Sequence, residues 1–523
     1  MSKTHLDTTV LIIGGGATGT GLARDLALRG IDCMVVERWD INAGASGGNH
    51  GLLHSGARYV LNDAKSAAQC KTENDCLKRL LPECIEDTGG IFGAVAGDDE
   101  NYIADFPGLC TKAGVPFREL DVDEAREMEP NLSESLIAAF EVSDATIDPF
   151  GFSLANIADA RLLGARLLLH TEITAIKTSA GSIQFVSAIN TQTGTEYRIK
   201  AKIVVSAAGA WSGLIASMAG VGLNMSYSKG SLLVNSSRIT ERVINRLRPP
   251  ADADILVPGG TVSIVGTTST RIDSPDDHRP SVEEVQYIID DISGIVPILD
   301  KTRYIRAYAG VRPLIQQNEE NDDRSASREF ELLDHGRDGL HNFITITSGK
   351  LTTFRYMAEK TADLICRKLD IDVACTTAES PFSNQYRKIW TMPGFAPKNW
   401  VHQRAGNDTL LCECEMVSKS AIDSIITDLN SASGQLDLRS IGLRSRVGKG
   451  PCQGGFCSIR TSAYLYDRQL IHQDQGIDAV RDFLSDRWTG QQPVLWGSQL
   501  AQAELSEAMH CGYFCLEQQE QQI

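Results

Sequence analysis

The chain has 523 residues, more than the roughly 250–300 at which a single hydrophobic core stops growing, so at least two domains are expected. Its net charge of −17 argues against a nucleic-acid binder and against electrostatic adhesion to anionic lipid. The sequence contains no apolar run of membrane-spanning length, and its 13 cysteines do not resemble the disulfide framework of a small secreted domain. We therefore expect a cytoplasmic protein without direct membrane insertion, whose thiols are free to bind metal.

The N-terminal segment predicts a dinucleotide site. Residues 8–13 are β-branched or apolar and indicate a buried parallel strand. A turn with the sequence GGGATG (14–19) follows, then a helix that ends near Gly30. A second strand over 33–36 is followed directly by Glu37. This order of strand, glycine-rich turn, helix and strand with a terminal acid is that of a Rossmann unit.

Individual residues of this unit have separate physical roles. Gly14 permits the tight turn, Gly16 lets the backbone approach a pyrophosphate, and Gly19 allows close packing of helix on strand. Glu37 is placed to accept hydrogen bonds from a ribose 2′-OH, where an acid would repel the extra phosphate of NADP. The alternative is a glycine-rich turn without a ligand, which both flanking strands and the acid disfavour.

Two further segments favour FAD over NAD. Residues 45–56 and the turn after the strand 203–206 are rich in small side chains, which let backbone lie against a bulky planar ligand. Large flavoproteins bind an extended FAD with segments that are distant in sequence. The residues expected to bind the cofactor are Gly14, Gly16, Ala17, Thr18, Gly19, Glu37, Arg38, Ala45, Ser46, Gly47, Gly48, His50, Gly51, Leu53, Ala208, Gly209, Gly349, Lys350, Leu351 and Thr352.

A change of character follows the first 375 residues. Prolines punctuate a predicted linker over 376–408. The next unit, 409–461, contains two tight cysteine pairs, Cys412/Cys414 and Cys452/Cys457, separated by a helix-forming stretch. Four such cysteines can converge on zinc or on a [2Fe-2S] cluster, or they can remain unligated thiols, and their spacing does not choose between these. Residues 462–523 have helical patterning and form a predicted tail, in which Cys511 and Cys515 are expected to be spare thiols.

Over about residues 6–375 the chain resembles the FAD-dependent glycerol-3-phosphate dehydrogenases. The resemblance rests on the Rossmann start and on three motifs: LHSGARY at 53–59, GVRPL at 310–314 and SGKLTT at 348–353. The cysteine unit resembles the [2Fe-2S] domain of bacterioferritin-associated ferredoxin, although its second pair has four intervening residues where that protein has two. With this unit included, the resemblance narrows to the large catalytic subunit of the anaerobic enzymes.

The resemblance implies an α/β fold in which a flavin domain is interleaved with an antiparallel-sheet substrate domain. The stretches 172–202 and 222–312 are expected to supply the substrate sheet. The implied substrate is glycerol 3-phosphate, oxidised to dihydroxyacetone phosphate. The implied partners are a second flavin subunit, which is the expected site of any FMN, and a membrane-associated iron–sulfur subunit that passes electrons to quinone. The chain would then lie on the cytoplasmic side of the bacterial inner membrane, attached through these partners.

The same resemblance assigns a phosphate-binding role to Arg58, Arg312 and Lys350, because arginine forks and a lysine point charge suit a dianion. Both arginines occur in apolar, glycine-rich sequence, where an unpaired charge would be costly, so a bound anion is expected beside them. Tyr59, Thr268 and Arg271 are further substrate-binding candidates.

The catalytic base has one first candidate, His54, which equally suits a structural hydrogen bond to ring or backbone. Some family members have a histidine after a Gly-Ser in the substrate domain, whereas here Gly230-Ser231 is followed by Leu232. Two other functions remain open. One is a dehydrogenase of an amine, opine or hydroxy acid. The other is a non-catalytic, electron-carrying flavoprotein subunit.

Overall fold

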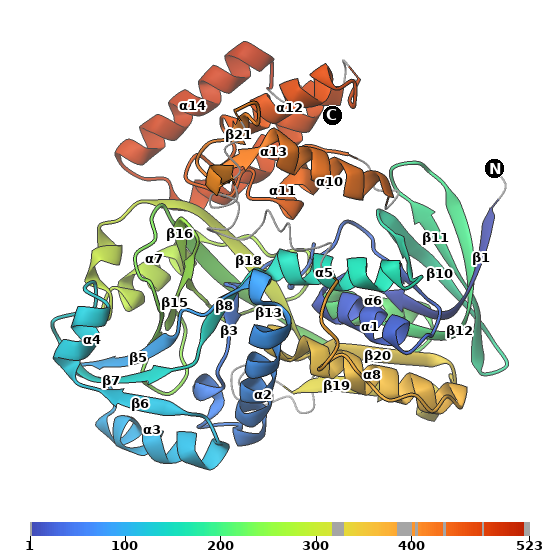
Figure 1. The fold of residues 1–523 in the computed structure, drawn as a ribbon, viewed down its shortest axis with the longest axis horizontal. Helices are drawn as coiled ribbons and strands as arrows, with labels where there is room; N and C mark the ends of the chain where they lie inside the picture. The colour runs from blue at the N-terminus through green and yellow to red at the C-terminus, as the bar shows by residue number, and fades with distance from the viewer. Residues whose placement is uncertain are drawn as a thin grey trace.

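The computed structural model describes residues 3–315, 329–383, 400–402, 406–431, 436–472 and 475–516 (Figure 1). Most of the linker predicted over 376–408 and the Gln/Glu-rich end over 517–522 lie outside the described residues. Within the described part, no helix has the length and apolar character needed to cross a bilayer.

The flavin-side sheet is built around the predicted Rossmann unit. Its strand order is β10-β11-β12-β1-β2-β9, with β20 beside β12 and β19 beside β20. Strand β1 pairs in parallel with both β2 and β12, as expected for buried strands of this kind. The strands are β1 (Thr4–Ile13), β2 (Cys33–Val36), β9 (Arg166–Leu168), β10 (Thr171–Ser179), β11 (Ser182–Asn190), β12 (Glu196–Ser206), β19 (Phe330–Asp334) and β20 (Phe343–Ser348).

Helices cover both faces of this sheet. Val10 and Ile12 of β1 pack with α1 (Ala17–Leu28), α5 (Pro149–Leu162) and α8 (Phe354–Leu369). Leu11 and Ile13, which alternate with them, pack on the opposite face against α6 (Ser212–Met218). Alternating residues of one strand thus enter two separate cores, which explains why the strand sequence is continuously apolar.

One sequence-based assignment to the second sheet is wrong. Residues 172–202 were expected in the substrate sheet, but they form β10, β11 and the start of β12 in the flavin-side sheet. The reason is that β12 continues to Ser206 and its end pairs with β1 and β20, so the β10–β11 hairpin stays with it. The prediction for 222–312 is confirmed, because this stretch contains strands β13 to β18 of the second sheet.

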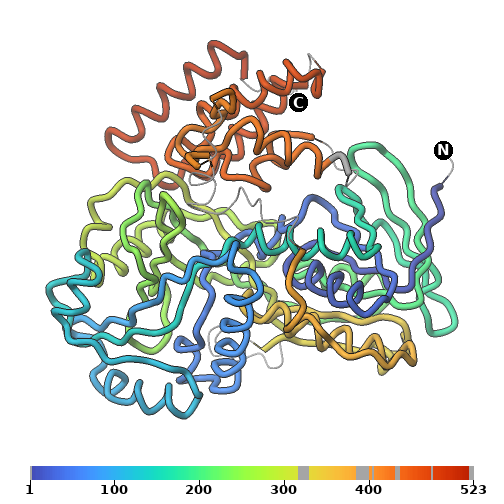
Figure 2. The backbone as a smooth tube through the Cα atoms, in the orientation of Figure 1, coloured from blue at the N-terminus to red at the C-terminus, as the bar shows by residue number. Residues whose placement is uncertain are grey.

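The substrate-side sheet has nine strands in the order β17-β13-β16-β15-β14-β5-β7-β6, with β18 beside β13. It combines strands from before and after β9–β12 of the flavin-side sheet, which makes the two halves interleaved (Figure 2). Its strands are β5 (Gly90–Val95), β6 (Phe117–Leu120), β7 (Leu136–Val142), β13 (Met225–Asn235), β14 (Val243–Arg246), β15 (Ile255–Gly259), β16 (Val262–Gly266), β17 (Thr270–Ile272) and β18 (Tyr304–Ile315).

Helices border this second sheet as well. Helix α7 packs its buried residues on the sheet, and α2 and α3 pack against each other near its other end. Their bounds, with those of the short α4, are α2 (Ala64–Leu80), α3 (Glu100–Ala113), α4 (Val122–Met128) and α7 (Val282–Ile292). A small sheet of β3 (Leu52–Leu53), β4 (Ile85–Glu86) and β8 (Ala145–Ile147) connects the two halves.

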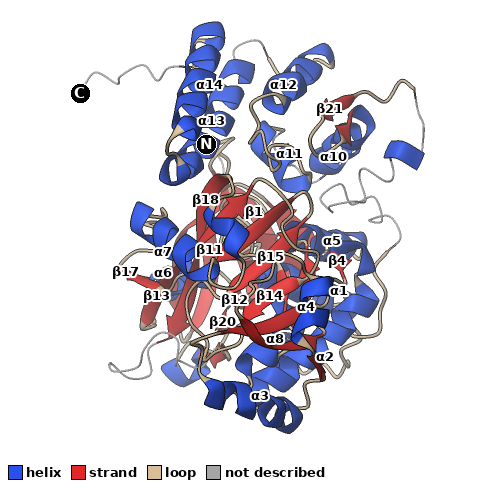
Figure 3. Cartoon of the chain, turned by 90° about the vertical axis from the view of Figure 1, so that its left-hand side faces the viewer, coloured by secondary structure: helices blue, strands red, loops and turns tan. Residues whose placement is uncertain are grey.

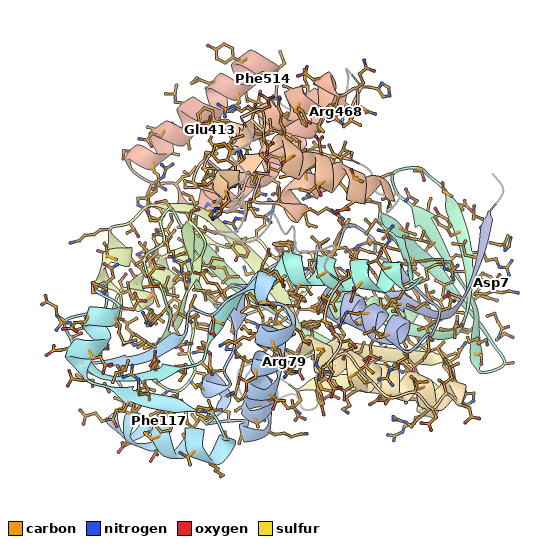
Figure 4. The ribbon with its side chains drawn as sticks, in the orientation of Figure 1. Asp7, Arg79, Phe117, Glu413, Arg468 and Phe514 are labelled. Atoms are coloured by element: carbon orange, nitrogen blue, oxygen red, sulfur yellow. The ribbon has the colours of Figure 1, made fainter. Side chains whose placement is uncertain are left out.

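The C-terminal residues form a helical unit that sits across both halves (Figure 3). Glu413, Arg468 and Phe514 all lie in this unit in Figure 4, away from Phe117 and Asp7 at the far ends of the body. The unit has its own apolar core, made largely of Ile, Leu and Val side chains. Its elements are β21 (Leu410–Cys412), β22 (Val417–Ser418), α10 (Lys419–Ser431), α11 (Leu438–Arg444), α12 (Cys457–Asp467), α13 (Gln475–Gln491) and α14 (Ser498–Phe514).

Specific contacts fix this C-terminal unit to the body. Arg444 makes a two-pronged ion pair with Asp40, at 2.6 and 2.7 Å, in which both side chains are nearly buried. Val494, after α13, is fully buried in the core of the substrate-side half. The unit is therefore joined to the body by this nearly buried ion pair, by a second pair between Arg306 and Asp486 at 3.3 Å, and by shared apolar packing.

Candidate active site

A cavity of about 670 Å³ opens between the two halves and is lined by segments from both. We call it the flavin cavity. Most predicted cofactor residues line it: Gly14, Gly16, Ala17, Thr18, Glu37, Arg38, Ala45, Ser46, Gly48, His50, Ala208, Gly209, Gly349, Lys350 and Leu351. Five others are not on its wall: Gly19, Gly47, Gly51, Leu53 and Thr352. Their positions are one layer behind, where they shape the backbone.

The glycine-rich turn has the geometry that a dinucleotide needs. A Cβ on Gly19 would lie 2.0 Å from the Gly14 carbonyl oxygen, so helix and strand approach as closely as predicted. Gly14 has φ +116°, a conformation that favours glycine. The backbone N–H of Ala17, in the first turn of α1, already donates to Ser46 Oγ at 2.9 Å. Gly16, Ala17 and Thr18 line the cavity, so this helix N-terminus faces the space where a phosphate would bind.

A second close approach lies between Gly48 and Gly310. A Cβ on Gly310 would lie 2.0 Å from the Gly48 carbonyl oxygen, so neither half tolerates a side chain here without a shift. The contact brings the small-residue segment of the flavin side against β18 of the substrate side. These backbones form a cradle for a planar ring, and the donor groups and shape of the cavity fit FAD.

Glu37 is part of the turn as well as a ribose ligand candidate. Its carboxylate accepts from the N–H groups of Gly15, at 2.6 Å, and Trp39, at 2.8 Å. Burial raises the pKa of this carboxyl above its ordinary value, and the two N–H donors act in the opposite direction. Arg38 lies over the ring of Trp39, 3.6 Å from its centroid, and near Trp211 at 4.8 Å.

The two tryptophans also line the flavin cavity, and sequence reasoning missed them. Their positions in the sequence could have indicated this. Trp39 directly follows the Glu37-Arg38 pair, and Trp211 directly follows the small-residue turn after the strand 203–206.

Arg312 is held in the flavin cavity by neutral oxygens. Its Nη1 donates to the Thr268 carbonyl at 3.0 Å and to Ser269 Oγ at 3.1 Å, and its Nη2 donates to Thr267 Oγ1. Gly230 makes room for this guanidinium, since a Cβ there would lie 2.6 Å from Nη2. These contacts hold the guanidinium in one orientation, which prepares its fork to receive an anion.

Arg58 also lines the flavin cavity, but the expectation that it lacks a protein counter-charge is wrong. Its Nη2 donates to Asp254 Oδ2 and to the Ala251 carbonyl, each at 2.9 Å. Asp254 is fully buried and pairs with Arg248 at 2.8 Å as well. The apolar, glycine-rich surroundings of Arg58 in the sequence gave no sign of this carboxylate, because it lies almost two hundred positions away.

Lys350 and His54 complete the polar side of the cavity. Lys350 Nζ donates to Ser66 Oγ at 2.9 Å and lies 4.7 Å from the centre of the Tyr59 ring. The His54 ring packs 5.2 Å from the Tyr59 ring, and its backbone N–H donates to Thr352 Oγ1 at 3.1 Å. All three side chains line the cavity. The position of His54 suits a base and a structural residue equally.

Two substrate-binding candidates lie elsewhere. Thr268 is buried behind the wall, where its Oγ1 accepts from the Ser231 N–H at 2.9 Å and donates to Glu284 at 3.1 Å. Arg271 is on the exposed edge strand β17 and does not line the cavity. The segment lies where it was expected, but Thr267 and Ser269, the neighbours of Thr268, reach the cavity instead. Alternate side chains of an extended segment point to opposite sides, and the sequence does not show which set faces the cavity.

The four predicted metal ligands come together in the C-terminal unit. Cys414 Sγ lies 3.7 Å from Cys412 Sγ and 3.8 Å from Cys452 Sγ, while Cys457 begins α12 and is buried beside them. The thiols of Cys414 and Cys457 and two backbone N–H groups lower the pKa of Cys452.

These thiols do not form a finished single-ion cage. Over the described ranges, no set of three or more His, Cys, Asp or Glu side chains is arranged to hold one metal ion. Three of the four sulfur atoms lie within 3.8 Å of a neighbouring one, and the metal and its ligand set stay a prediction.

Comparisons with known proteins agree with this geometry. The family model described as FAD dependent oxidoreductase matches residues 9–364. A subunit of the anaerobic glycerol-3-phosphate dehydrogenase of Escherichia coli K12 is 42% identical, covering 98% of this chain and 97% of that protein. The corresponding protein of Haloferax volcanii is 36% identical, covering 96% and 90%. The FAD complex of glycerol-3-phosphate dehydrogenase from Bacillus halodurans has the same fold, with a TM-score of 0.64 at 20% identity, covering 94% of this chain and 96% of that one.

Proposed function

The chain belongs to the FAD-dependent oxidoreductases, within the group that contains these anaerobic glycerol-3-phosphate dehydrogenase subunits, and from this premise we propose its reaction. It oxidises sn-glycerol 3-phosphate to dihydroxyacetone phosphate, and FAD, when bound, accepts the hydride that the substrate carbon gives up. One observation carries the proposal. Three cations, Arg58, Arg312 and Lys350, line the same cavity as the dinucleotide turn.

The protein side chains divide the work as follows. Arg312 binds the phosphate, because its fork is already oriented by Thr267, Thr268 and Ser269. Lys350 supplies a second positive charge from the other side of the cavity. Arg58 contributes less direct attraction, since Asp254 offsets its charge, and it shapes the cavity wall instead.

The proton of the oxidised hydroxyl requires an acceptor. His54 is the group we assign, because it lines the cavity beside Tyr59 and a neutral imidazole accepts a proton near pH 7. Its close packing keeps bulk water from one side of the ring, since His54 is only 9% exposed.

The substrate assignment is tested by a dye-linked assay of the purified chain with a panel of alcohols, amines and hydroxy acids. Oxidation of glycerol 3-phosphate to dihydroxyacetone phosphate, with glycerol inactive, is the expected result. Preference for sarcosine, an opine or a hydroxy acid would favour the other enzymatic function. That function needs one arginine for a carboxylate, whereas the cavity presents Arg312 and Lys350 in addition to Arg58, whose charge Asp254 offsets. Inactivity with every substrate in the presence of bound FAD would favour an electron-carrying flavoprotein.

Electrons are proposed to leave through the cysteine unit. Cys412, Cys414, Cys452 and Cys457 would hold a [2Fe-2S] cluster, which supplies one-electron steps between flavin and an external acceptor. Their gathering in one partly buried corner supports this, and zinc is the alternative. Iron and acid-labile sulfide analysis of anaerobically purified protein, with electron paramagnetic resonance after reduction, separates the two. Zinc in place of iron would refute the cluster.

The remaining steps involve other proteins. The relatives are themselves named as subunits, which implies further chains in their assemblies. For this chain we propose a second flavin subunit, with any FMN, and a membrane-associated iron–sulfur subunit that delivers electrons to quinone. This would place the chain on the cytoplasmic side of the bacterial inner membrane. Co-purification of the tagged chain from membranes, lost on deletion of the partner genes, is the expected result.

A further inference from the structure

A second cavity, of about 290 Å³, lies between the body and the C-terminal unit, and we call it the interface cavity. Asn49 and His50 line both this cavity and the flavin cavity, so one thin wall separates them. On its other side the lining includes Lys449 and Gln453, from the loop that leads into Cys452 and Cys457. No step of the proposed reaction uses this space.

Four cations converge on the interface cavity from three elements. They are Arg306 of β18, Arg446 and Lys449 of the cysteine loop, and Arg487 of α13. Carboxylates partly balance them: Arg446 pairs with the buried Glu415 at 2.9 Å, and Arg306 with Asp486 at 3.3 Å. Asp486 also lies 3.9 Å from Arg487, so one acid serves both arginines. Glu86 and Asp148 line the cavity too.

Glu86 is paired, whereas Asp148 has a partner on only one of its two oxygens. Glu86 pairs with Arg238 at 2.8 Å, and Asp148 accepts from the Phe150 N–H at the start of α5, at 3.0 Å. Lys449 Nζ lies 4.2 Å from the centre of the Phe150 ring and 3.5 Å from the Leu443 carbonyl. Among the described residues, no carboxylate lies within ion-pair distance of this ammonium group.

Several buried polar atoms around this cavity lack a hydrogen-bond partner within the described part of the chain. Two of them are donors, Nη1 of Arg306 and Nε of Arg487, and two are acceptors, Oε1 of Gln453 and Oδ2 of Asp148, which an oxyanion does not satisfy. Gln453 is only 3% exposed. Unsatisfied buried donors on arginines are costly, and an oxyanion is the ligand that satisfies such donors. The wall also has an apolar part, with Ile147, Val234, Val262 and Ile264.

We propose that the interface cavity binds a phosphate monoester with an apolar body. Its phosphate would contact Arg306, Arg487 and Lys449, and its body would lie against the apolar wall toward Asn49 and His50. The site is separate from the flavin cavity and does not depend on the substrate or the metal proposed above. A ligand there would touch both the body and the cysteine loop, and would hold them together.

The test uses the full-length chain with bound FAD, in an Arg312→Gln background that weakens phosphate binding in the flavin cavity. Phenyl phosphate and inorganic phosphate are the probes, with phenol and sodium chloride at equal ionic strength as controls. Labelling of each lysine by reductive methylation is followed by peptide mass spectrometry. Phenyl phosphate should protect Lys449 severalfold, at a lower concentration than inorganic phosphate, and phenol should give no protection. Labelling of Lys449 that is equal in phenyl phosphate and chloride would overturn the proposal.

A matched pair of variants locates the site by calorimetric titration with phenyl phosphate. Arg487→Gln should weaken binding about tenfold or more, as expected for loss of one charge-assisted bond. The control is Arg439→Gln, which removes another arginine near Asp486. The Arg439 side chain is 78% exposed, so this variant should leave the affinity unchanged. Equal binding by both variants, each with its normal flavin spectrum, would show that the ligand lies elsewhere.

Discussion

The flavin cavity and the cysteine unit assemble their chemistry in opposite ways. The cavity wall combines segments near residues 16, 48, 209, 312 and 350, so its chemistry depends on long-range packing of two sheets. The four cysteines lie within one stretch, 412–457, and converge through a short hairpin and the start of one helix. A substitution of one cysteine should therefore affect only the C-terminal unit. A substitution in the cavity should affect binding or stability according to whether it lies in the flavin-side or the substrate-side half.

The charges of the two regions differ as well. In the flavin cavity two hydroxyls and a carbonyl orient Arg312, while around the cysteines Arg444 and Arg446 are fixed by carboxylates. The first arrangement prepares a guanidinium for a ligand. In the second, the Arg444–Asp40 pair attaches the C-terminal unit to the body, whereas the Arg446–Glu415 pair lies within that unit. The predictions below test this division.

The largest effect is expected for Cys452→Ser, which should remove bound iron and abolish electron delivery to the partner proteins. Reduction of FAD by substrate should remain, because the flavin cavity shares no residue with the cysteine pairs. The measurements are the iron content, the electron paramagnetic resonance signal of the reduced protein, and anaerobic bleaching of the flavin by substrate. Cys515→Ser, at an exposed position, is the control and should change none of them. Full iron content in Cys452→Ser would exclude this cysteine as a ligand.

Arg312→Gln should lower kcat/KM for glycerol 3-phosphate about a hundredfold or more, because it removes a charge-assisted bond and leaves the phosphate poorly paired. Steady-state kinetics with an artificial acceptor measure this. The matched control is Arg271→Gln, on the exposed edge of the same sheet, which should retain normal kinetics. A similar loss in both variants would mean that general electrostatic attraction, and not a specific contact, binds the substrate.

Arg444→Gln should reduce the stability of the attachment between the C-terminal unit and the body by about 2 kcal/mol or more, since it leaves Asp40 buried without its partner. The effect would be seen as faster proteolytic cleavage between the body and the C-terminal unit than in the wild type, measured while the flavin is still bound. Arg439→Gln, also in α11 but with an exposed side chain, should behave as the wild type. Unchanged protease resistance in Arg444→Gln would contradict a role for this ion pair in docking.

Gly310→Ala should have a smaller effect, about 1–3 kcal/mol of destabilisation, because the added Cβ meets the Gly48 carbonyl. The midpoint temperature of thermal unfolding and the amount of FAD retained are measured, and both should fall together. Gly222→Ala is the control, since a Cβ at that position has no atom of the described residues within 4 Å. Normal FAD retention in Gly310→Ala would mean that the cradle is less tight than the contact implies.

The fold and site were predictable where a short segment determines the chemistry. The Rossmann strands, the glycine turn and Glu37 could be identified from adjacent residues, because local geometry fixes the role of each. The convergence of the four cysteines could be predicted for the same reason. Lys350 comes directly before η6 (Leu351–Thr353), which runs into α8.

Long-range pairing set the limit. The membership of β10 and β11 in the flavin-side sheet depends on where β12 ends, and the charge state of the Arg58 environment depends on Asp254, far along the chain. The choice between Thr268 and its neighbours depended on the phase of an extended segment, which one residue of shift reverses. No pattern near these residues carries that information.

Anaerobic addition of substrate to the purified yellow protein tests the central claim most directly, with flavin absorbance followed over time. Bleaching by glycerol 3-phosphate, and none by glycerol, sarcosine or a hydroxy acid, is the predicted result. Bleaching by an amine or hydroxy acid, or no bleaching by the phosphate ester in protein that carries FAD, would contradict the account.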